Sequence, residues 1–261
     1  MLQILLHSSK TMRTRPETLL PYQAPQFLAR AEELAGYLRS LDVSEVAHVM
    51  KLSPDKAAST VELMARWSSG ESGSRPAIDA FIGDIYSGLQ VHTWTPADRH
   101  EANGRLLILS GLYGGLRACD SVVPYRLEMG YRLPTMPEKN LYQYWGDTLA
   151  TLLSPSAKSL VNLSAVEYTK ALLPYINTPV VTPRFLTVSP KNGEPIFVVV
   201  HAKIARGAFA KWLVVNRIDN TEQLTLFDDL GYRYDASLST PEQPVYVCQE
   251  FGGIGLSVRL S

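Results

Sequence analysis

The chain has 261 residues, of which 46% are hydrophobic and 19% charged, a composition typical of a globular protein. Its 25 basic and 25 acidic side chains cancel, so the overall charge gives no reason to expect nucleic acid or a membrane as a partner. Any anionic ligand would need a local basic patch. The two cysteines, Cys119 and Cys248, lie far apart, which argues against a zinc knuckle, a redox pair or a disulfide framework.

The first ten residues predict a strand. Leu2 to Leu6 is a continuous apolar run, bounded by His7-Ser8-Ser9-Lys10. No basic region precedes this run and no small-residue cleavage site follows it, so it does not resemble a signal peptide. No stretch approaches the roughly 20 apolar residues that a membrane helix needs. We therefore expect a cytoplasmic protein without membrane contact.

Helical patterns follow an irregular connection over residues 11–23. Apolar residues recur at spacings of three and four between Pro25 and Leu38. Asp42 then caps a short helix, which breaks at Lys51-Leu52-Ser53-Pro54 before a second helix from Asp55 to Trp67.

These two short helices resemble a helix–hairpin–helix element over about residues 43–67. Such an element binds DNA phosphates through hairpin amides and a helix N-terminus. Ser53 and Pro54 stand where DNA-binding hairpins usually carry glycine. An ordinary pair of packed helices is therefore the alternative interpretation.

Apolar runs in the rest of the chain predict a sheet. Residues 106–109 form a buried strand that ends at Ser110-Gly111, and residues 81–89 form a strand-like run interrupted by Gly83 and Gly88. Further strands are expected at residues 160–164, 180–188 and 195–201 and as a closing pair within 227–247, with helices from Thr95, Asn140, Ala165 and Lys203.

Because strands alternate with helices, the predicted class is α/β (α+β), a single domain over residues 1–261 with a mixed β-sheet covered by helices. We expect the glycine-rich tail, about residues 250–261, to be loosely held. No GxGxxG follows the first strand and no GxxxxGK[ST] occurs, which counts against dinucleotide-binding and P-loop folds.

Ionisable residues gather beside glycines at the ends of the apolar runs. In an open sheet the carboxyl ends of strands form the usual ligand crevice. Arginines there suit a carboxylate or phosphate, because the planar guanidinium binds either through two hydrogen bonds. A buried ion-pair network, with Arg126 satisfying Glu128 or Asp120, explains the same residues equally well. This first candidate site comprises Lys10, Asp84, Tyr86, Arg117, Asp120, Tyr125, Arg126, Glu128 and Arg206.

The sequence also bears on two other kinds of site, a metal site and a DNA-binding site. The five histidines show no HxxxH or HExxH spacing, so we expect no metal and no cofactor. Basic residues could instead line a groove and hold DNA phosphates without reading bases, although a solvated helix face is the simpler interpretation. The candidate DNA contacts are Lys51, Lys56, Lys203, Arg206 and Lys211.

Six sequence blocks occur in the order found in one protein family. The chain resembles the YaaA family of bacterial peroxide-stress proteins from the first strand to about Gly231-Tyr232. The blocks are FIGDIYSGL from Phe81, LSGLYGGLRACD from Leu109, PYRLEMG from Pro124, LYQYWGD from Leu141, NLSAVEY from Asn162 and AKIARGAFAKWLVVNRI from Ala202.

The resemblance implies a cytoplasmic mixed α/β protein of unusual topology that is linked to limiting intracellular iron and oxidative DNA damage. It also implies binding of double-stranded DNA through a positively charged cleft and a helix–hairpin–helix element. One departure stands out. The family's first strand is usually followed by Ser-Pro-Ala-Lys-Thr, and this chain has His7 in place of that serine while Lys10 and Thr11 are retained. Serine acyl chemistry is therefore disfavoured.

Two functional hypotheses follow. The leading one is a peroxide-stress protein that grips duplex or distorted DNA through backbone phosphates and helps limit iron-dependent oxidative damage. The alternative is an enzyme acting on a small anionic or nucleobase-like substrate in the glycine-framed pocket. In that case Arg126, with Arg117, would bind the anion, and the candidate catalytic residues are Lys10, Asp84, Tyr125, Arg126 and Glu128.

Overall fold

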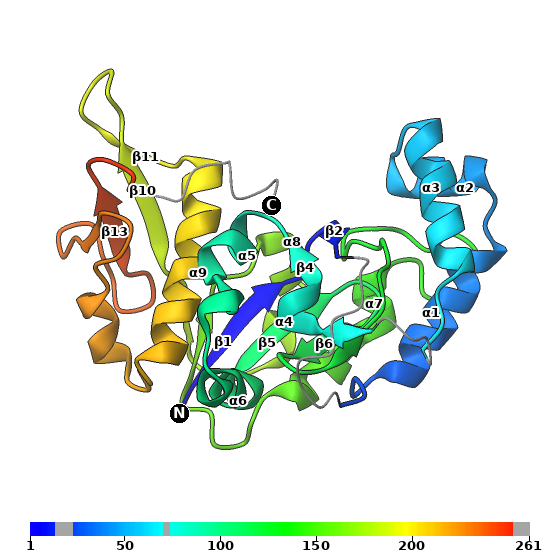
Figure 1. Cartoon of the computed structure of the whole chain (residues 1–261), viewed down its shortest axis with the longest axis horizontal. Helices are drawn as coiled ribbons and strands as arrows, with labels where there is room; N and C mark the ends of the chain where they lie inside the picture. The colour runs from blue at the N-terminus through cyan, green and yellow to red at the C-terminus, as the bar shows by residue number, and fades with distance from the viewer. Residues whose placement is uncertain (14–22, 70–73, 253–261) are drawn as a thin grey trace.

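A computed structural model of the chain describes residues 1–13, 23–69 and 74–252. Its centre is a five-stranded sheet in the order β6-β5-β1-β8-β9 (Figure 1). Strands β5, β1, β8 and β9 run parallel, and β6 pairs with β5 in the antiparallel sense. Their bounds are β1 Leu2–His7, β5 Leu106–Ser110, β6 Gly114–Arg117, β8 Ser159–Asn162 and β9 Val180–Val181.

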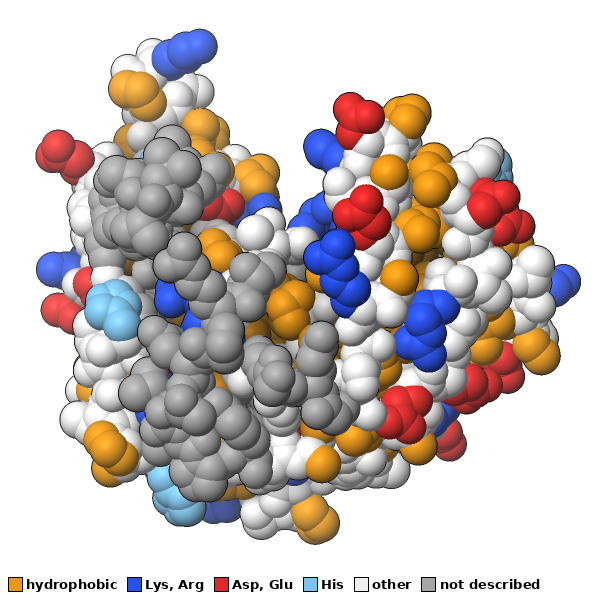
Figure 2. Space-filling view, turned by 45° about the vertical axis from the view of Figure 1, so that its right-hand side comes forward, with side chains coloured by type: hydrophobic (Ala, Val, Ile, Leu, Met, Phe, Trp, Pro, Cys, Tyr) orange, Lys and Arg blue, Asp and Glu red, His pale blue; other side chains and the backbone are white. Residues whose placement is uncertain are grey.

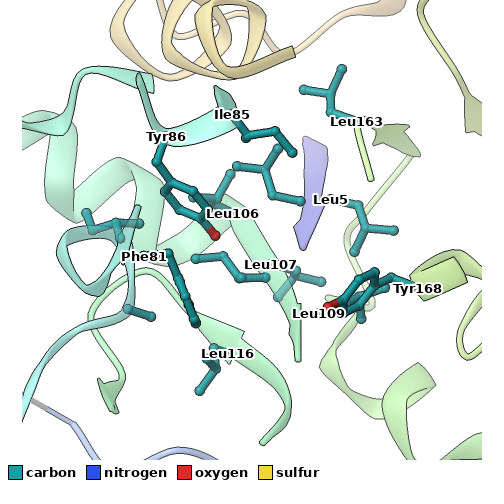
Figure 3. Packing of buried hydrophobic residues seen from close by; sticks show 14 of the residues in the cluster. Leu5, Phe81, Ile85, Tyr86, Leu106, Leu107, Leu109, Leu116, Leu163 and Tyr168 are labelled. Atoms are coloured by element: carbon teal, nitrogen blue, oxygen red, sulfur yellow. The ribbon is translucent and has the colours of Figure 1, made fainter. Parts of the chain in front are cut away.

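Burial explains the central strands. Leu2, Ile4, Leu5 and Leu6 of β1 are each at most 1% exposed, so this strand is covered on both faces, as a continuous apolar run predicts. Figure 3 shows Leu5 and Leu107 of the sheet among the aromatic rings of Phe81, Tyr86 and Tyr168, which belong to the surrounding elements. The expected first strand and the strand after Arg105 are both confirmed.

The helices that cover this sheet include α4 (Ala77–Ala80), α5 (Asp84–Leu89), α6 (Pro96–Arg105), α7 (Leu141–Trp145) and α8 (Val166–Thr169). Thr95 caps α6 by accepting a hydrogen bond from the Asp98 amide, as predicted. Short 3₁₀ turns lie at Val91–Thr93, Gly146–Leu152, Leu173–Tyr175 and Thr221–Leu226, and short paired strands at β2 (Thr11–Met12), β3 (Arg75–Pro76), β4 (Phe81–Ile82) and β7 (Ser121–Val122).

A second sheet lies on the other side of α9 (Val199–Val215), which separates it from the central sheet (Figure 1). Its strand order is β11-β10-β13-β12, with bounds β10 Arg184–Val188, β11 Pro195–Ile196, β12 Tyr232–Tyr234 and β13 Val245–Cys248. The expected hairpin (β10–β11) and closing pair (β12–β13) are both present and antiparallel. The mixed α/β class is therefore confirmed. In place of the single expected sheet, the described residues form the central sheet, this four-stranded sheet and two two-stranded sheets.

Helices α1 (Leu28–Ser40), α2 (Val43–Met50) and α3 (Pro54–Ala65) project from the opposite side of the molecule (Figure 1). Asp42 and Glu45 form a reciprocal capping box at the start of α2, and Lys51 ends that helix in the left-handed conformation, with φ of 51°. The two short helices predicted within residues 43–67 are confirmed as helices.

Two strand predictions were wrong. Residues 84–89, expected in an interrupted strand, form α5, and residues 199–201, expected in the hairpin strand, are the first turn of α9. Both errors arise at apolar, β-branched or glycine-containing sequence, where local preference is weak and packing decides. The predicted tail falls mainly on residues 253–261, and the irregular connection mainly on 14–22, outside the described residues.

Helices α5 and α9 pack with almost no space between their backbones. A Cβ added to Gly88 would lie 2.0 Å from the carbonyl oxygen of Ile204, and one added to Gly207 would lie 1.8 Å from that of Ile85. Only glycine permits this approach at the crossing. The contact fixes the start of α5 against one face of α9, and both contribute side chains to the site described next.

Candidate functional site: a polar pocket at the end of β1

A pocket of about 530 Å³ opens at the carboxyl end of β1. From β1 the chain passes to β5 on one side, and it returns later to β8 on the other, so this end of β1 is a topological switch point of the sheet. Ligands of open α/β sheets bind in such crevices. The lining residues come from β1 and its extension, from the β4–α5 turn, and from Glu128, Ala165, Glu167, Tyr168 and Lys203.

His7 is a neutral imidazole in this pocket. Its Nδ1 accepts a hydrogen bond of 3.1 Å from the amide of Ala165, and its ring stacks on Tyr168 with centroids 4.8 Å apart. Burial, together with the positive charges of Arg206 and Lys203, lowers the pKa of His7 to about 3. Because Nδ1 is the acceptor, the ring proton resides on Nε2, so His7 offers the pocket a neutral N–H donor.

Lys10 and Glu128 form an ion pair in the pocket. The ammonium nitrogen lies 2.7 Å from Oε2 of Glu128, whose other oxygen accepts a hydrogen bond from the hydroxyl of Tyr131. Side-chain exposure is 61% for Lys10 and 12% for Glu128. The largely buried carboxylate of Glu128 is thus paired with a cation that solvent can reach. An anionic ligand could therefore bind Lys10 in place of Glu128.

Asp84 and Lys203 face each other across the α5–α9 crossing. Their charged atoms are 3.9 Å apart, and the Asp84 side chain is 12% exposed. Gly83, with φ of 151°, precedes α5, and a Cβ there would lie 3.1 Å from Oγ of Ser9. The glycine at position 83 therefore lets the β4–α5 turn approach the end of β1 and brings Asp84 to the pocket.

Tyrosines close the inner side of the pocket. The Tyr86 hydroxyl donates a 3.0 Å hydrogen bond to the backbone oxygen of His7, and Ser8 lies 3.4 Å from the Tyr168 hydroxyl. Burial raises the pKa of both tyrosines above the ordinary value. Both phenols are therefore protonated hydrogen-bonding groups at neutral pH.

The structure gathers only part of the first candidate site. Lys10, Asp84, Tyr86 and Glu128 line the pocket, and Arg206 lies close enough to His7 for its charge to act on the imidazole. Tyr125 is buried beneath it, 3% exposed, where its hydroxyl lies 2.6 Å from Oγ of Ser110.

Five members of that set are not among the lining residues: Tyr125 and Arg206, and also Arg117, Asp120 and Arg126. Arg117 donates to the carbonyl of Leu152, and its own amide donates to Asp120. Asp120 also accepts a hydrogen bond from the side-chain amide of Gln23, and burial raises the pKa of Asp120 to about 6. Arg126 lies outside the lining, and its buried Nε has no hydrogen-bond partner among the described residues. The predicted pairing of Arg126 with Glu128 is not present, because Lys10 takes that role.

The candidate DNA contacts fall into two groups. Lys51 and Lys56 are exposed on the α2–α3 element. Lys203, Arg206 and Lys211 lie along α9, where Lys211 donates to the side chain of Gln90 at 2.7 Å. Figure 2 shows the surface hollowed between the part carrying the β10–β11 hairpin and the projecting α1–α3 part, with Lys and Arg side chains along the hollow and acidic ones among them.

Sequence reasoning missed three pocket residues. His7 was noted only as a departure from the family pattern, and Glu167 and Tyr168 were placed on a helix without a role. All three line the pocket, and Glu167 accepts the amide of Gly130 at 2.9 Å. The signal that could have found them is their position at a strand end, because His7 is the last residue of β1 and the NLSAVEY block, which holds Glu167 and Tyr168, begins at the last residue of β8.

No group of three or more His, Cys, Asp or Glu side chains in residues 1–13, 23–69 and 74–252 is arranged to hold a metal ion. Within the same ranges, no helix has the length and apolar character needed to cross a membrane.

The fold and pocket define a mixed α/β protein with a ligand-sized polar crevice at a strand switch point. Comparison with known proteins places it more narrowly. A family model described as "Peroxide stress protein YaaA" matches residues 2–238, and the chain belongs to this family. Relatives include a UPF0246 protein of Salinispora tropica, 54% identical over 98% of this chain and 97% of the relative, and one of Marinomonas sp., 36% identical over 95% and 98%. A UPF0246 protein of Cereibacter sphaeroides is 38% identical over 93% and 98%.

Proposed function

We propose that this member of the peroxide-stress family binds double-stranded or distorted DNA through backbone phosphates and thereby helps limit iron-dependent oxidative damage. The observation that supports it best is the surface hollow of Figure 2, which is bordered by basic side chains and lies between the hairpin and α1–α3. Lys51 and Lys56 of the α2–α3 element are exposed, so a phosphate can reach both side chains. Such contacts position a duplex without reading its sequence.

A salt titration tests this proposal. Each phosphate contact contributes about −0.9 to the slope of log affinity against log salt, so five contacts give a slope of about −4.5. The double variant Lys51→Gln/Lys56→Gln should bind unrelated duplexes more weakly and reduce the slope by about 2. Lys158→Gln is the matched control, because Lys158 is exposed near the amino end of β8, where its amide bonds Met1.

The proposal fails if linear and branched duplexes show no binding to the wild-type protein at low salt. It also fails if the double variant and Lys158→Gln lose affinity equally, since that would mean a general charge effect. A peroxide-survival assay with the same variants then connects DNA binding to protection.

The pocket favours a second candidate function, an enzyme acting on a small anionic or nucleobase-like substrate. The specific observation is the meeting of neutral His7 with the Lys10–Glu128 and Lys203–Asp84 pairs at the strand switch point. Non-specific DNA binding does not require carboxylates in its site. In this role Glu128 accepts a proton from substrate and Lys10 balances its charge, while His7 Nε2–H donates to a substrate oxygen or nitrogen.

This second function is tested by separating protection from DNA binding. Glu128→Gln keeps the shape of the side chain and removes its charge, so it should abolish peroxide protection while leaving the DNA salt titration unchanged. Lys158→Gln should be silent in both assays. Full protection by Glu128→Gln and by Lys10→Met would exclude a catalytic role for this pair.

A further inference from the structure

Arg206 is a cation beside the pocket that lacks a partner among the described residues. Arg206 on α9 makes no hydrogen bond, ion pair or ring contact with any residue in the described part of the chain. It is only partly exposed, and burial lowers its pKa. Partly desolvating a guanidinium without a compensating anion is unfavourable, so proteins usually pair such groups.

The other basic residues nearby are already engaged. Lys10 lies 2.7 Å from Glu128, Lys203 lies 3.9 Å from Asp84, and Lys211 donates to Gln90. Arg206 follows Lys203 by three residues on α9, so the two side chains emerge from the same face of the helix. Arg206 is not itself a lining residue, but Lys203 on the same helix face is, and the positive charge of Arg206 helps to lower the pKa of His7, which also lines the pocket.

From these observations we infer that Arg206 is the anion-binding group of the pocket, the role that the sequence had assigned to Arg126 and Arg117. The ligand is a small molecule with one carboxylate or phosphate, which the guanidinium binds through two parallel hydrogen bonds. This inference rests on the proposal that the pocket binds a small molecule, and it adds the chemical class of that molecule.

The rest of the pocket defines the other end of the ligand. Three carboxylates line it, those of Asp84, Glu128 and Glu167, and each can accept a hydrogen bond from an N–H or O–H group. The ligand is therefore an anion that carries N–H or O–H donors in addition to its carboxylate or phosphate.

Calorimetric titration at low salt tests the anion contact with three probes, acetate, glycolate and inorganic phosphate. Glycolate differs from acetate by one hydroxyl donor and should bind more tightly. Arg206→Gln should weaken binding of the best probe by at least tenfold, as expected for the loss of a charge-assisted contact. Arg206→Lys keeps the charge but loses the planar geometry, so its loss should be intermediate, and Lys158→Gln should bind as the wild type does.

Thermal unfolding separates a ligand-binding role from a structural one. If the counter-ion of Arg206 is a ligand, Arg206 is uncompensated in the ligand-free protein. Arg206→Gln then removes a partly desolvated charge and should raise the melting temperature of the ligand-free protein by a few degrees. A lowered melting temperature would mean that Arg206 supports the fold. The lowered melting temperature would overturn the inference. Unchanged probe affinity in Arg206→Gln would also overturn it, and so would a wild-type protein that binds none of the probes.

The anion could also be a phosphate of bound DNA, and the same variant distinguishes this source. If Arg206 serves DNA, Arg206→Gln should reduce the salt slope of duplex binding by about 1, and phosphate should compete with the duplex. If Arg206 serves a small molecule, duplex binding should be unchanged while acetate, glycolate or phosphate binding is lost. The Lys51→Gln/Lys56→Gln variant reports on the DNA proposal independently, because neither lysine lies in the pocket.

Discussion

The two basic regions of this molecule differ in how their charges are held. On α2 and α3, Lys51 and Lys56 stand in solvent, where a charge is well hydrated and interacts weakly with its neighbours. On α9, Lys203 and Arg206 lie against a second helix and beside a pocket, and their charges lower the pKa of His7. The same residue types are therefore well hydrated in one region and partly desolvated in the other, so an anion would interact more strongly with the cations on α9 than with Lys51 and Lys56.

The largest expected effect comes from separating α5 and α9. Gly207→Ala places a Cβ 1.8 Å from the Ile85 carbonyl, so we expect a loss of about 3 kcal/mol or more in the free energy of unfolding. Gly104→Ala is the control, because Gly104 lies in helix α6 and a Cβ there meets nothing within 4 Å. The control should be neutral or stabilising by up to about 1 kcal/mol, since alanine is the better helix former.

Chemical denaturation of both variants measures this difference. If the pocket depends on the α5–α9 packing and the α2–α3 element does not, Gly207→Ala should also weaken small-anion binding in the pocket. Hydrogen exchange in α2 and α3 should stay as in the wild type. Equal stability of the two variants would show that the helices can separate without strain.

A change of pH should have an intermediate effect on the free energy of unfolding, through His7 in the pocket. The pKa of His7 is lowered to about 3 in the folded state, against about 6.5 in an unfolded chain. Between these values the unfolded state binds one proton more, so this residue's contribution to stability is lost as pH falls from about 6.5 towards 3. The slope approaches about 1.4 kcal/mol per pH unit in that window.

Denaturation curves at several pH values between 4 and 7 test this, with His7→Asn as the comparison. The variant should lack the His7 part of the slope. Parallel pH profiles for the two proteins would mean that His7 is protonated and solvated in the folded state.

The smallest effect should come from the projecting helices. Lys51→Gln and Lys56→Gln should each change the free energy of unfolding by less than about 0.5 kcal/mol, because both side chains are exposed and form no short ion pair in the described structure. Denaturation together with the DNA titration checks this. A loss above about 1 kcal/mol in the free energy of unfolding would mean that these lysines have a structural role, and it would contradict the difference between α2–α3 and α9.

The sequence predicted the parts whose local signals are strong. The apolar runs of β1 and β5 could only be buried strands in an α/β chain, and the caps at Asp42 and Thr95 placed the starts of α2 and α6. The six ordered blocks identified the family that the comparison then confirmed. The sequence also indicated that Lys10, Asp84 and Glu128 belong to a site, because each stands near a glycine or at the end of an apolar run.

Tertiary structure alone decided which of these residues meet. Residues 84–89 and 199–201 became helical because α5 and α9 pack through Gly88 and Gly207, a contact between segments over a hundred residues apart that no local pattern encodes. The same packing brought Lys203 to Asp84 and left Arg206 near His7 without a partner among residues 1–13, 23–69 and 74–252. Which cation pairs with which carboxylate depends on distance and burial in the folded chain, and so the choice between Arg126 and Arg206 could not be made from sequence.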